Sequence, residues 1–208
     1  MNNFLPDKLT IGITGGIGAG KSVVSRILRC NGFDVYDCDT KAKNIMISDP
    51  KVKNSLVMAL GEEVYEPDGE LNKKYLAKLM FSDDEIRNYV NSVVHSAVKQ
   101  DIFVAREENK GWFFIESAIL ATSGIENICD SIWIVESSEE TKLRRVMERD
   151  NLSESQIKAR MQIQIKELSV TKNRRVEILK NDFGNPLLSK VLKLTDKYIN
   201  HQIYTISC

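Results

Sequence analysis

The chain has 208 residues and a formal net charge of zero at pH 7, because 29 lysines and arginines balance 29 acidic residues. This length is enough for one well-buried α/β core with an inserted subdomain. A non-specific nucleic-acid binder would be expected to carry a basic excess, so the balance argues against that class. The scattered cysteines, and the lack of a leader-like N-terminus or a long apolar run, predict a cytoplasmic protein without a membrane span.

The first predicted strand, Leu9–Thr14, leads into a glycine-rich segment, residues 15–22, which we call the phosphate loop. Its spacing of Gly, four residues, Gly, Lys and Ser fits the template for loops that hold nucleotide phosphates. Glycines let backbone N–H groups turn toward a phosphate. Lys21 supplies charge for the outer phosphates, and Ser22 supplies a hydroxyl for Mg²⁺. The residues expected to contact the nucleotide are Gly16, Ile17, Gly18, Ala19, Gly20, Lys21, Ser22 and Val23.

A helix is predicted from Lys21 to Arg29, because its apolar residues recur at helical spacing. Strand, glycine loop and helix therefore follow one another in the order that places a phosphate at a helix N-terminus. This context favours a nucleoside triphosphate site over a glycine-rich turn without a ligand.

A second strand is predicted at Phe33–Tyr36, and two carboxylates, Asp37 and Asp39, follow it. Open α/β sheets bind ligands outside the carboxyl ends of their strands, so this pair is a candidate for chemistry. Aspartate also commonly caps helices, and a helix is predicted from Thr40 to Ile47. We expect one carboxylate to cap that helix and at least one to face the γ-phosphate.

Residues 49–109 are predicted to be helical, with no convincing strand. The expected helices are Pro50–Leu60, Leu71–Phe81 and a long helix from Ser82 or Asp83 to Glu107. This length exceeds one crossover between parallel strands, so we interpret the segment as an inserted subdomain for the second substrate. His95 lies beside the apolar stripe of the long helix and is either a surface histidine or a contact to that substrate.

Two more strands are predicted, at Trp112–Glu116 and Ser131–Val135. Glu116 ends the first of them, where an acid could order Mg²⁺ through water. Helices are expected at Glu139–Asp150 and Ser153–Leu168, and the polar composition of the second suits a hinged flap better than a core helix.

Arg145 and Arg149 share a helix face because they lie four residues apart. They are either part of a solvated surface or a phosphate clamp on a mobile lid, since a guanidinium can hold phosphate oxygens with two donors. Arg160 and Gln164 have the same spacing on the next helix.

The last strand is predicted at Val176–Lys180, followed by a loop that contains Asn181 and by a final helix that begins at Asn185–Pro186. Strands that alternate with helices predict a three-layer α/β phosphate-loop fold with a five-stranded parallel sheet. We expect a single domain divided into a core (1–48, 110–140 and 174–208), a helical insertion (about 49–109) and a helical lid (about 141–173).

Taken in order, these motifs resemble dephospho-CoA kinase, a family in the nucleoside monophosphate kinase-like group. The resemblance lies in Gly12–Ser22, Asp37-Cys38-Asp39 with Ala42 and Lys43, Asp68-Gly69-x-Leu71-x-Lys73 with Phe81, Leu143-x-Arg145-x-x-x-Arg149-Asp150, Arg160-x-x-x-Gln164 and Asn181. The chain departs from the family pattern at Lys43, Lys73, Ser96, Ala118, Thr122 and Arg175-Val176.

The resemblance implies phosphorylation of the ribose 3′-hydroxyl of dephospho-CoA by ATP with Mg²⁺, which gives coenzyme A and ADP in the last step of coenzyme A synthesis. It implies that Asp39 accepts or orients the hydroxyl proton. The implied site residues are Asp39, Lys21 and Arg145 for catalysis, Arg145, Arg149 and Asn181 with the phosphate loop for ATP, Asp39, Lys73, His95 and Arg160 for dephospho-CoA, and Ser22 for the metal. We expect small-molecule partners only, with no nucleic acid or membrane, and a monomer or small homo-oligomer.

The nearest alternative is another small phosphate-loop kinase, acting on a nucleoside monophosphate or a small alcohol and differing only in the acceptor. A GTP-binding switch would normally carry an Asn-Lys-x-Asp motif, and the nearest string, residues 72–75 (NKKY), lacks the acid. A nucleotide-regulated binding module is the remaining alternative.

Overall fold

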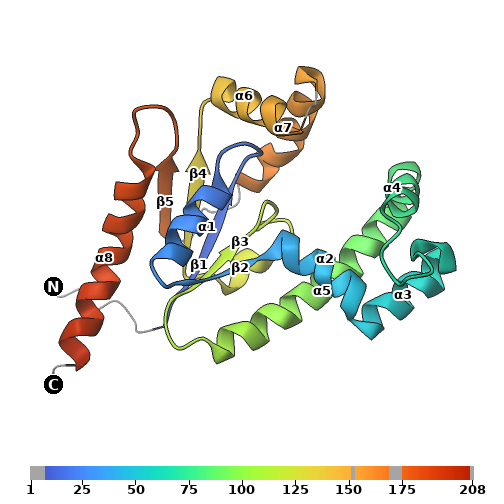
Figure 1. Cartoon of the computed structure of the whole chain (residues 1–208), viewed down its shortest axis with the longest axis horizontal. Coiled ribbons are helices and arrows are strands. Elements are labelled where there is room, and N and C mark those ends of the chain that lie inside the picture. The colour runs from blue at the N-terminus through green and yellow to red at the C-terminus, as the bar shows by residue number, and fades with distance from the viewer. Residues whose placement is uncertain (1–7, 151–152, 169–174, 207–208) are drawn as a thin grey trace. The chain divides into compact units, whose positions relative to one another are not determined.

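The computed structural model describes residues 8–150, 153–168 and 175–206, and the side chains of these ranges except 163–168 and 197–206. The described residues form two compact units (Figure 1). We call the first the sheet unit; it runs from residue 8 to Tyr36 and continues from Asn109. We call the second, Asp37–Glu108, the helical unit.

A five-stranded parallel sheet with the order β2-β3-β1-β4-β5 is the centre of the fold, which confirms the predicted α/β class (Figure 1). The strands are β1 (Thr10–Gly15), β2 (Asp34–Asp37), β3 (Phe113–Glu116), β4 (Ser131–Glu136) and β5 (Arg175–Lys180). Because the strands are parallel, their carboxyl ends share one edge, where ligands of such sheets bind.

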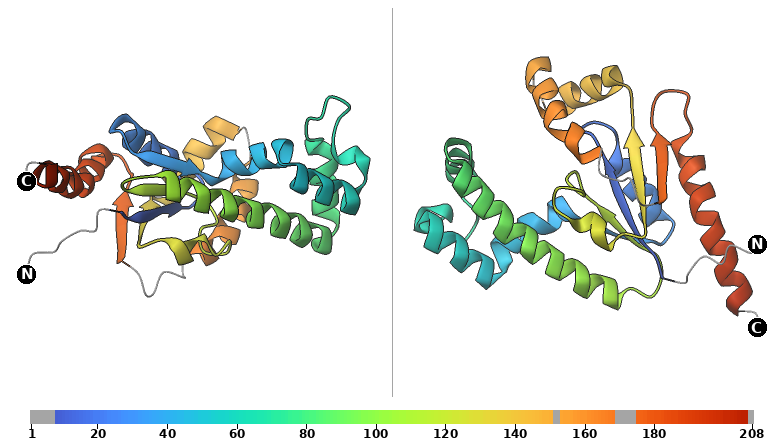
Figure 2. Two further views of the ribbon diagram at one scale, coloured as in Figure 1. Left: turned by 90° about the horizontal axis from the view of Figure 1, so that it is seen from below. Right: turned by 180° about the vertical axis from the view of Figure 1, so that it is seen from behind.

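The helices of the sheet unit follow the strands in sequence. They are α1 (Lys21–Cys30), α6 (Glu139–Asp150), α7 (Glu154–Leu168) and α8 (Leu187–Ile206), with a short 3₁₀ turn, η2 (Ile125–Ile128). Helix α1 packs over β1 and β3, α8 contacts both β5 and α1, and α6 contacts α7 (Figure 2). The chain leaving β1 therefore enters α1 directly through the phosphate loop.

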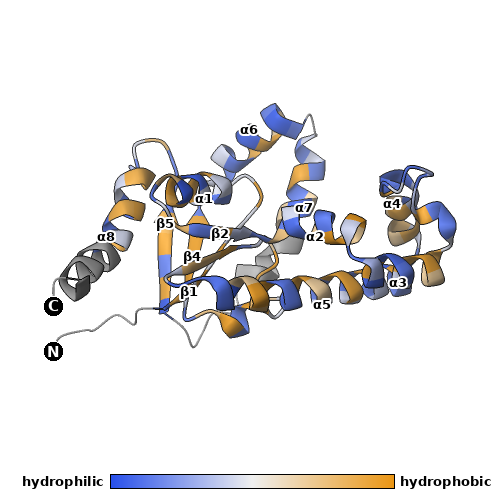
Figure 3. Cartoon of the chain, turned by 60° about the horizontal axis from the view of Figure 1, so that its bottom comes forward, coloured by the Kyte–Doolittle hydropathy of each residue, from blue (hydrophilic) through white to orange (hydrophobic). Residues whose placement is uncertain are grey.

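The core of the sheet unit forms where one face of β1 meets α1 and α8. Ile11 and Ile13 alternate onto this face and join the buried Val24 and Leu28 of α1. Phe114 is fully buried, and burying a side chain of this size contributes about 1.5–3 kcal/mol. Figure 3 shows the apolar residues concentrated on the strands of the sheet. The loop after β1 is thus anchored at both ends by buried apolar residues.

The helical unit consists of helices with short connections. They are α2 (Cys38–Ser48), α3 (Pro50–Leu60), the 3₁₀ turn η1 (Glu62–Val64), α4 (Lys73–Ser82) and α5 (Asp84–Glu108). Helix α5 buries one residue at every fourth position, namely Val90, Val94, Val98 and Ile102. This stripe explains how one long helix packs against α2, α3 and α4.

Helix starts follow the expected capping chemistry, with two corrections, the first being that α2 begins at Cys38 and not at the predicted Thr40. The Asp37 carboxylate caps α2 by accepting from the Thr40 N–H at 3.1 Å, and Asp83 caps α5 by accepting from the Glu85 N–H at 2.7 Å. Helix α4 begins at Lys73, so its predicted start at Leu71 is wrong. The Asn72 side chain caps α4, and Leu71 instead pairs with Tyr65 in an isolated antiparallel bridge.

The predicted division of the chain differs from the two compact units, which separate no lid from the core and begin the helical unit earlier. The helical unit begins at Asp37 and therefore includes α2, which the sequence division left in the core. The division into core, insertion and lid stays a prediction, and residues 169–173 of the predicted lid lie outside the described residues. No helix in the described part of the chain is long and apolar enough to cross a membrane.

Candidate nucleotide site

The phosphate loop connects the end of β1 to the start of α1 and carries glycines where the backbone requires them. Gly18 and Gly20 have φ of 75° and 100°, in the left-handed region that side chains with a Cβ rarely adopt. A Cβ on Gly20 would lie 2.1 Å from Asn181 Nδ2, and one on Gly18 would lie 2.8 Å from the Lys142 carbonyl oxygen. Gly18 and Gly20 therefore allow the loop to turn, and they also leave room for α6 and Asn181 to lie close to its backbone.

Two carbonyl groups of the phosphate loop are bound from outside the loop. The Gly18 carbonyl accepts a hydrogen bond from Arg145 Nη1 at 3.3 Å. The Ala19 carbonyl accepts from Asn181 Nδ2 at 2.8 Å and from Ser137 Oγ at 3.2 Å. In a trans peptide the N–H points opposite to the carbonyl, so the N–H of the residue after Ala19 points away from Asn181. A phosphate cradle at a helix N-terminus needs this orientation.

The Lys21 ammonium and the Ser22 hydroxyl, the two side chains predicted to serve the nucleotide phosphates and Mg²⁺, lie in different environments. Lys21 Nζ donates to the carbonyls of Gly15 at 2.8 Å and Gly16 at 3.4 Å, so its ammonium lies against the first half of the loop. Ser22 and Val23 are exposed in the first turn of α1. The lysine is held in place, whereas the hydroxyl of Ser22 is accessible.

Arg145 is bound to protein acceptors on three segments. Its Nη1 donates to Ser137 Oγ at 3.1 Å as well as to the Gly18 carbonyl, and its Nη2 donates to the Asn181 carbonyl at 2.9 Å. The planar guanidinium can hold several acceptors at once because its donors are fixed in one fork. Helix α6 is thereby connected to the phosphate loop and to the turn after β5.

Arg149 has a different partner, although it lies one turn further along α6. Its Nε and Nη2 donate to the Asp150 carboxylate at 2.6 and 2.7 Å. This pairing lowers the pKa of Asp150 and raises that of Arg149. The side chain of Arg149 is 64% exposed. The structure thus separates the two arginines that sequence spacing grouped together.

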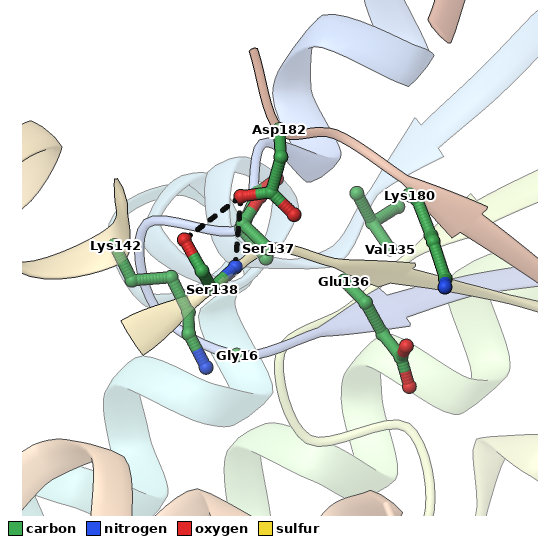
Figure 4. A pocket seen from close by; sticks show the side chains of 9 residues that line it. Gly16, Val135, Glu136, Ser137, Ser138, Lys142, Lys180 and Asp182 are labelled. Carbon is green, nitrogen blue, oxygen red and sulfur yellow. Dashed lines mark hydrogen bonds between the residues drawn. The ribbon is translucent and has the colours of Figure 1, made fainter. Parts of the chain in front are cut away.

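A hollow of about 310 Å³ borders the phosphate loop (Figure 4). Its lining comprises Gly16, Ala19, Val135, Glu136, Ser137, Ser138, Lys142, Lys180 and Asp182. The Asp182 carboxylate accepts from both the N–H and the Oγ of Ser138 at 2.9 Å, and these bonds lower its pKa. Sequence patterns did not identify Ser137, Lys142, Lys180 or Asp182 as site residues. Ser137 and Asp182 lie just after β4 and β5, and Lys180 ends β5, so their places at the carboxyl ends of strands were the available signal, whereas Lys142 lies on α6.

The remaining predicted site residues lie elsewhere in the fold. Asp39 is exposed in the first turn of α2, Lys73 is exposed at the first position of α4, and His95 is half-buried on α5, all in the helical unit. Arg160 is exposed on α7 of the sheet unit, and the side chain of its partner Gln164 lies outside the described residues. Among the predicted contacts that the structure describes outside the phosphate loop, Arg145 and Asn181 hydrogen-bond to loop carbonyls. Lys21 does so from within the loop.

The two residues predicted to serve a hard cation each offer one oxygen-bearing group. Ser22 offers one hydroxyl, and Glu116 is half-buried at the end of β3. The described residues contain no group of three or more His, Cys, Asp or Glu side chains that could hold a metal ion. Any Mg²⁺ site built here would take most of its ligands from phosphates and water, as Mg²⁺ commonly does with nucleotides.

Comparison with known proteins gives one consistent result. The family model described as dephospho-CoA kinase matches residues 9–186. A dephospho-CoA kinase of Porphyromonas gingivalis (strain ATCC BAA-308 / W83) is 38% identical over 189 residues, which cover 90% of this chain and 93% of the relative. The solved structure of TT1252 from Thermus thermophilus is 30% identical with a TM-score of 0.77 and covers 92% of this chain and 98% of its own. A dephospho-CoA kinase from Campylobacter jejuni, 22% identical with a TM-score of 0.66, covers 91% of this chain and 96% of its own and shares the fold.

Proposed function

The chain belongs to the dephospho-CoA kinase family, and we propose that it transfers the γ-phosphoryl group of ATP to the ribose 3′-hydroxyl of dephospho-CoA. The products are coenzyme A and ADP. ATP binding, the donor half of this proposal, is supported by the phosphate loop. The Gly18 and Ala19 carbonyls of the loop accept hydrogen bonds from Arg145 and Asn181. The acceptor half is supported by the family match, which does not favour a nucleoside monophosphate or a small alcohol.

On the donor side, catalysis would come from positioning and charge neutralisation. The loop amides would hold the phosphates of ATP. Lys21, whose ammonium lies beside the Gly15 and Gly16 carbonyls, would turn donors toward the β- and γ-phosphate oxygens. Asn181 and Arg145 would keep the loop in its binding shape from behind.

Mg²⁺ fits this site as a cation brought by the nucleotide. Ser22 Oγ, exposed in the first turn of α1, would be its protein ligand, with Glu116 acting through water. When bound, Mg²⁺ neutralises charge on the oxygens of the transferring phosphoryl group.

On the acceptor side, we propose that Asp39 accepts or orients the proton of the 3′-hydroxyl. A hydroxyl has a pKa far above 7, so the carboxylate takes the proton only as the transition state forms. Lys73, His95 and Arg160 are the proposed dephospho-CoA contacts. Lys73 would act as a point charge, since its ammonium lacks the planar fork of arginine.

We propose that α6 and α7 form a lid that closes over the bound nucleotide. Arg149 would then exchange its bonds to Asp150 for phosphate oxygens, which are equally good acceptors for a guanidinium. Closure would exclude water, which otherwise competes with the 3′-hydroxyl as the nucleophile. We also propose a cytoplasmic location and a monomer or small homo-oligomer.

An acceptor panel tests this function. Purified protein with ATP and Mg²⁺ is assayed for ADP release against dephospho-CoA, nucleoside monophosphates, shikimate and no acceptor. We expect rapid ADP release only with dephospho-CoA, and loss of that activity on chelation of Mg²⁺. Faster turnover with another acceptor would assign a different kinase, and equal turnover with no acceptor would favour a switch or binding module.

A further inference from the structure

Ser137, the first residue after β4, has its hydroxyl where three segments of the sheet unit meet. Ser137 Oγ lies 3.2 Å from the Ala19 carbonyl oxygen of the phosphate loop and 2.9 Å from the Asn181 carbonyl oxygen of the turn after β5. It also accepts from Arg145 Nη1 of α6 at 3.1 Å. The three partners are far apart in sequence, and Ala19 is 118 positions from Ser137.

The Ser137 hydroxyl is not needed to satisfy any one of these partners. The Ala19 carbonyl also accepts from Asn181 Nδ2, and Arg145 also donates to the Gly18 and Asn181 carbonyls. A hydroxyl has a single hydrogen to donate, so it strengthens only one carbonyl contact at a time. Its distinct contribution is geometric, because it fixes the guanidinium of Arg145 relative to the peptide between Ala19 and Gly20.

The neighbouring Ser138 has a different set of contacts. Its hydroxyl accepts from the Thr141 N–H at 3.3 Å at the start of α6 and donates to Asp182 at 2.9 Å. The first is a helix-cap contact and the second a bond to the turn after β5, and neither involves the phosphate loop or Arg145. Of the two adjacent serines, Ser138 thus caps α6, whereas Ser137 contacts the phosphate loop.

We propose that Ser137 is a positioning residue for the nucleotide, acting through Arg145 to hold the phosphate loop in its binding shape. This inference rests on the proposed function, since it assumes that the loop binds ATP. The loop holds the phosphates in the ground state and the transition state alike. Loss of the Ser137 hydroxyl therefore weakens nucleotide binding more than it slows the chemical step.

The test compares Ser137→Ala, Ser137→Thr and a control, Ser48→Ala, whose exposed hydroxyl only bonds the Asn44 carbonyl. The Kd of ADP, the KM of ATP and kcat are measured for each. For Ser137→Ala we expect the Kd and the KM to rise about tenfold, the size of one hydrogen bond to a charged group, with kcat changed less than about threefold. Ser137→Thr keeps a γ-hydroxyl and should restore most of the affinity, and Ser48→Ala should match the unmodified protein.

A double substitution tests whether the effect passes through Arg145. In an Arg145→Ala background, adding Ser137→Ala should change the Kd of ADP less than about twofold, because the partner it positions is gone. Equal effects of Ser137→Ala with and without Arg145 would overturn the inference. So would an unchanged Kd in Ser137→Ala itself.

The outcomes separate this inference from the proposed function. If the unmodified protein makes no coenzyme A but binds ADP, the proposed function fails while the Kd series still tests Ser137. If the unmodified protein is active and Ser137→Ala binds ADP equally well, only the role of Ser137 fails. Should Ser137→Ala unfold at the assay temperature, Ser137→Cys replaces it, because a thiol is a weaker donor and acceptor of similar shape. An unchanged Kd for ADP in Ser137→Cys would overturn the inference.

Discussion

The two compact units hold their candidate residues in different ways. In the sheet unit, Lys21, Arg145 and Asn181 each donate hydrogen bonds to backbone carbonyls of the phosphate loop. In the helical unit, Asp39 and Lys73 are exposed near the starts of α2 and α4. The nucleotide side is therefore shaped by contacts within the chain, whereas Asp39 and Lys73 on the proposed acceptor side are accessible charges that a substrate would have to order.

This difference predicts two classes of variants. Substitutions at the phosphate loop should change nucleotide affinity together with rate, because the same bonds shape the loop and hold the phosphates. Substitution of an exposed acceptor-side residue should change the rate while ATP affinity and the melting temperature survive. Five substitutions follow, taken from the largest expected effect to the smallest, with Arg149→Lys as the matched variant of Arg145→Lys.

Asp39→Asn is expected to have the largest effect on rate. Loss of the proposed base should lower kcat by about 10³-fold, within the usual range for a general base. The Kd of ATP and the Tm should stay unchanged, because Asp39 is exposed and Asp37 makes the cap of α2. Steady-state kinetics, nucleotide titration and a thermal melt give the three readouts, and near-normal kcat would remove Asp39 from the base role.

Lys21→Ala should lower kcat/KM by about 10²-fold or more, as removal of a charge donor from a phosphoryl-transfer site does. In contrast to Asp39→Asn, Lys21→Ala should also weaken nucleotide binding, because the ammonium of Lys21 lies against the phosphate loop. The Kd of ATP by titration calorimetry and the initial rates provide the comparison. An unchanged Kd would mean that the loop does not use Lys21 for binding.

Arg145→Lys should lower kcat/KM by about tenfold to 100-fold, because lysine keeps the charge and loses the fork that binds three segments. Arg149→Lys is the matched variant on the same helix, and its exposed bonds to Asp150 should make it the milder change. Both are compared by kcat/KM for ATP under saturating dephospho-CoA. Equal effects would contradict the distinction between the two arginines.

Asp182→Asn should have the smallest effect, visible only in the pH dependence of Tm. Bonds from Ser138 lower the pKa of the Asp182 carboxyl, so its contribution to stability is present above the unfolded pKa of about 3.9 and is lost as pH falls through the lower folded value. Asparagine keeps an acceptor but does not titrate. We expect the Tm of the variant to fall less steeply than that of the unmodified protein below about pH 4, and identical slopes would show that Asp182 contributes nothing to the acid dependence.

Local signals predicted the strands, the helices and the position of the phosphate loop. Residue spacing and capping preferences act within a few positions, so Pro50–Leu60 and the glycines of the loop could be identified directly. The start of α4 was predicted two residues early, because the apolar Leu71 fits the helical pattern but pairs with Tyr65.

Contacts between distant segments could not be read from local patterns. Asn181 reaches Ala19 across 162 positions, and Ser137 joins the same carbonyl from a third segment. Spacing likewise placed Arg145 and Arg149 on one face of a helix, but only tertiary structure shows that one is bound to the loop and the other to its neighbour, Asp150. The resemblance to a family supplied the role of Asp39, which no local pattern distinguishes from a second helix cap.

The measurement that tests the proposed activity most directly is the identity of the product. Purified protein is incubated with ATP, Mg²⁺ and dephospho-CoA, and the products are analysed by ³¹P NMR and mass spectrometry. We predict one new phosphomonoester on the ribose 3′-oxygen for each ADP formed, with no product from the Asp39→Asn variant on the same timescale. A phosphate on any other atom, or ADP formed without a phosphorylated acceptor, would contradict the assignment of this chain as an ATP-dependent kinase of dephospho-CoA.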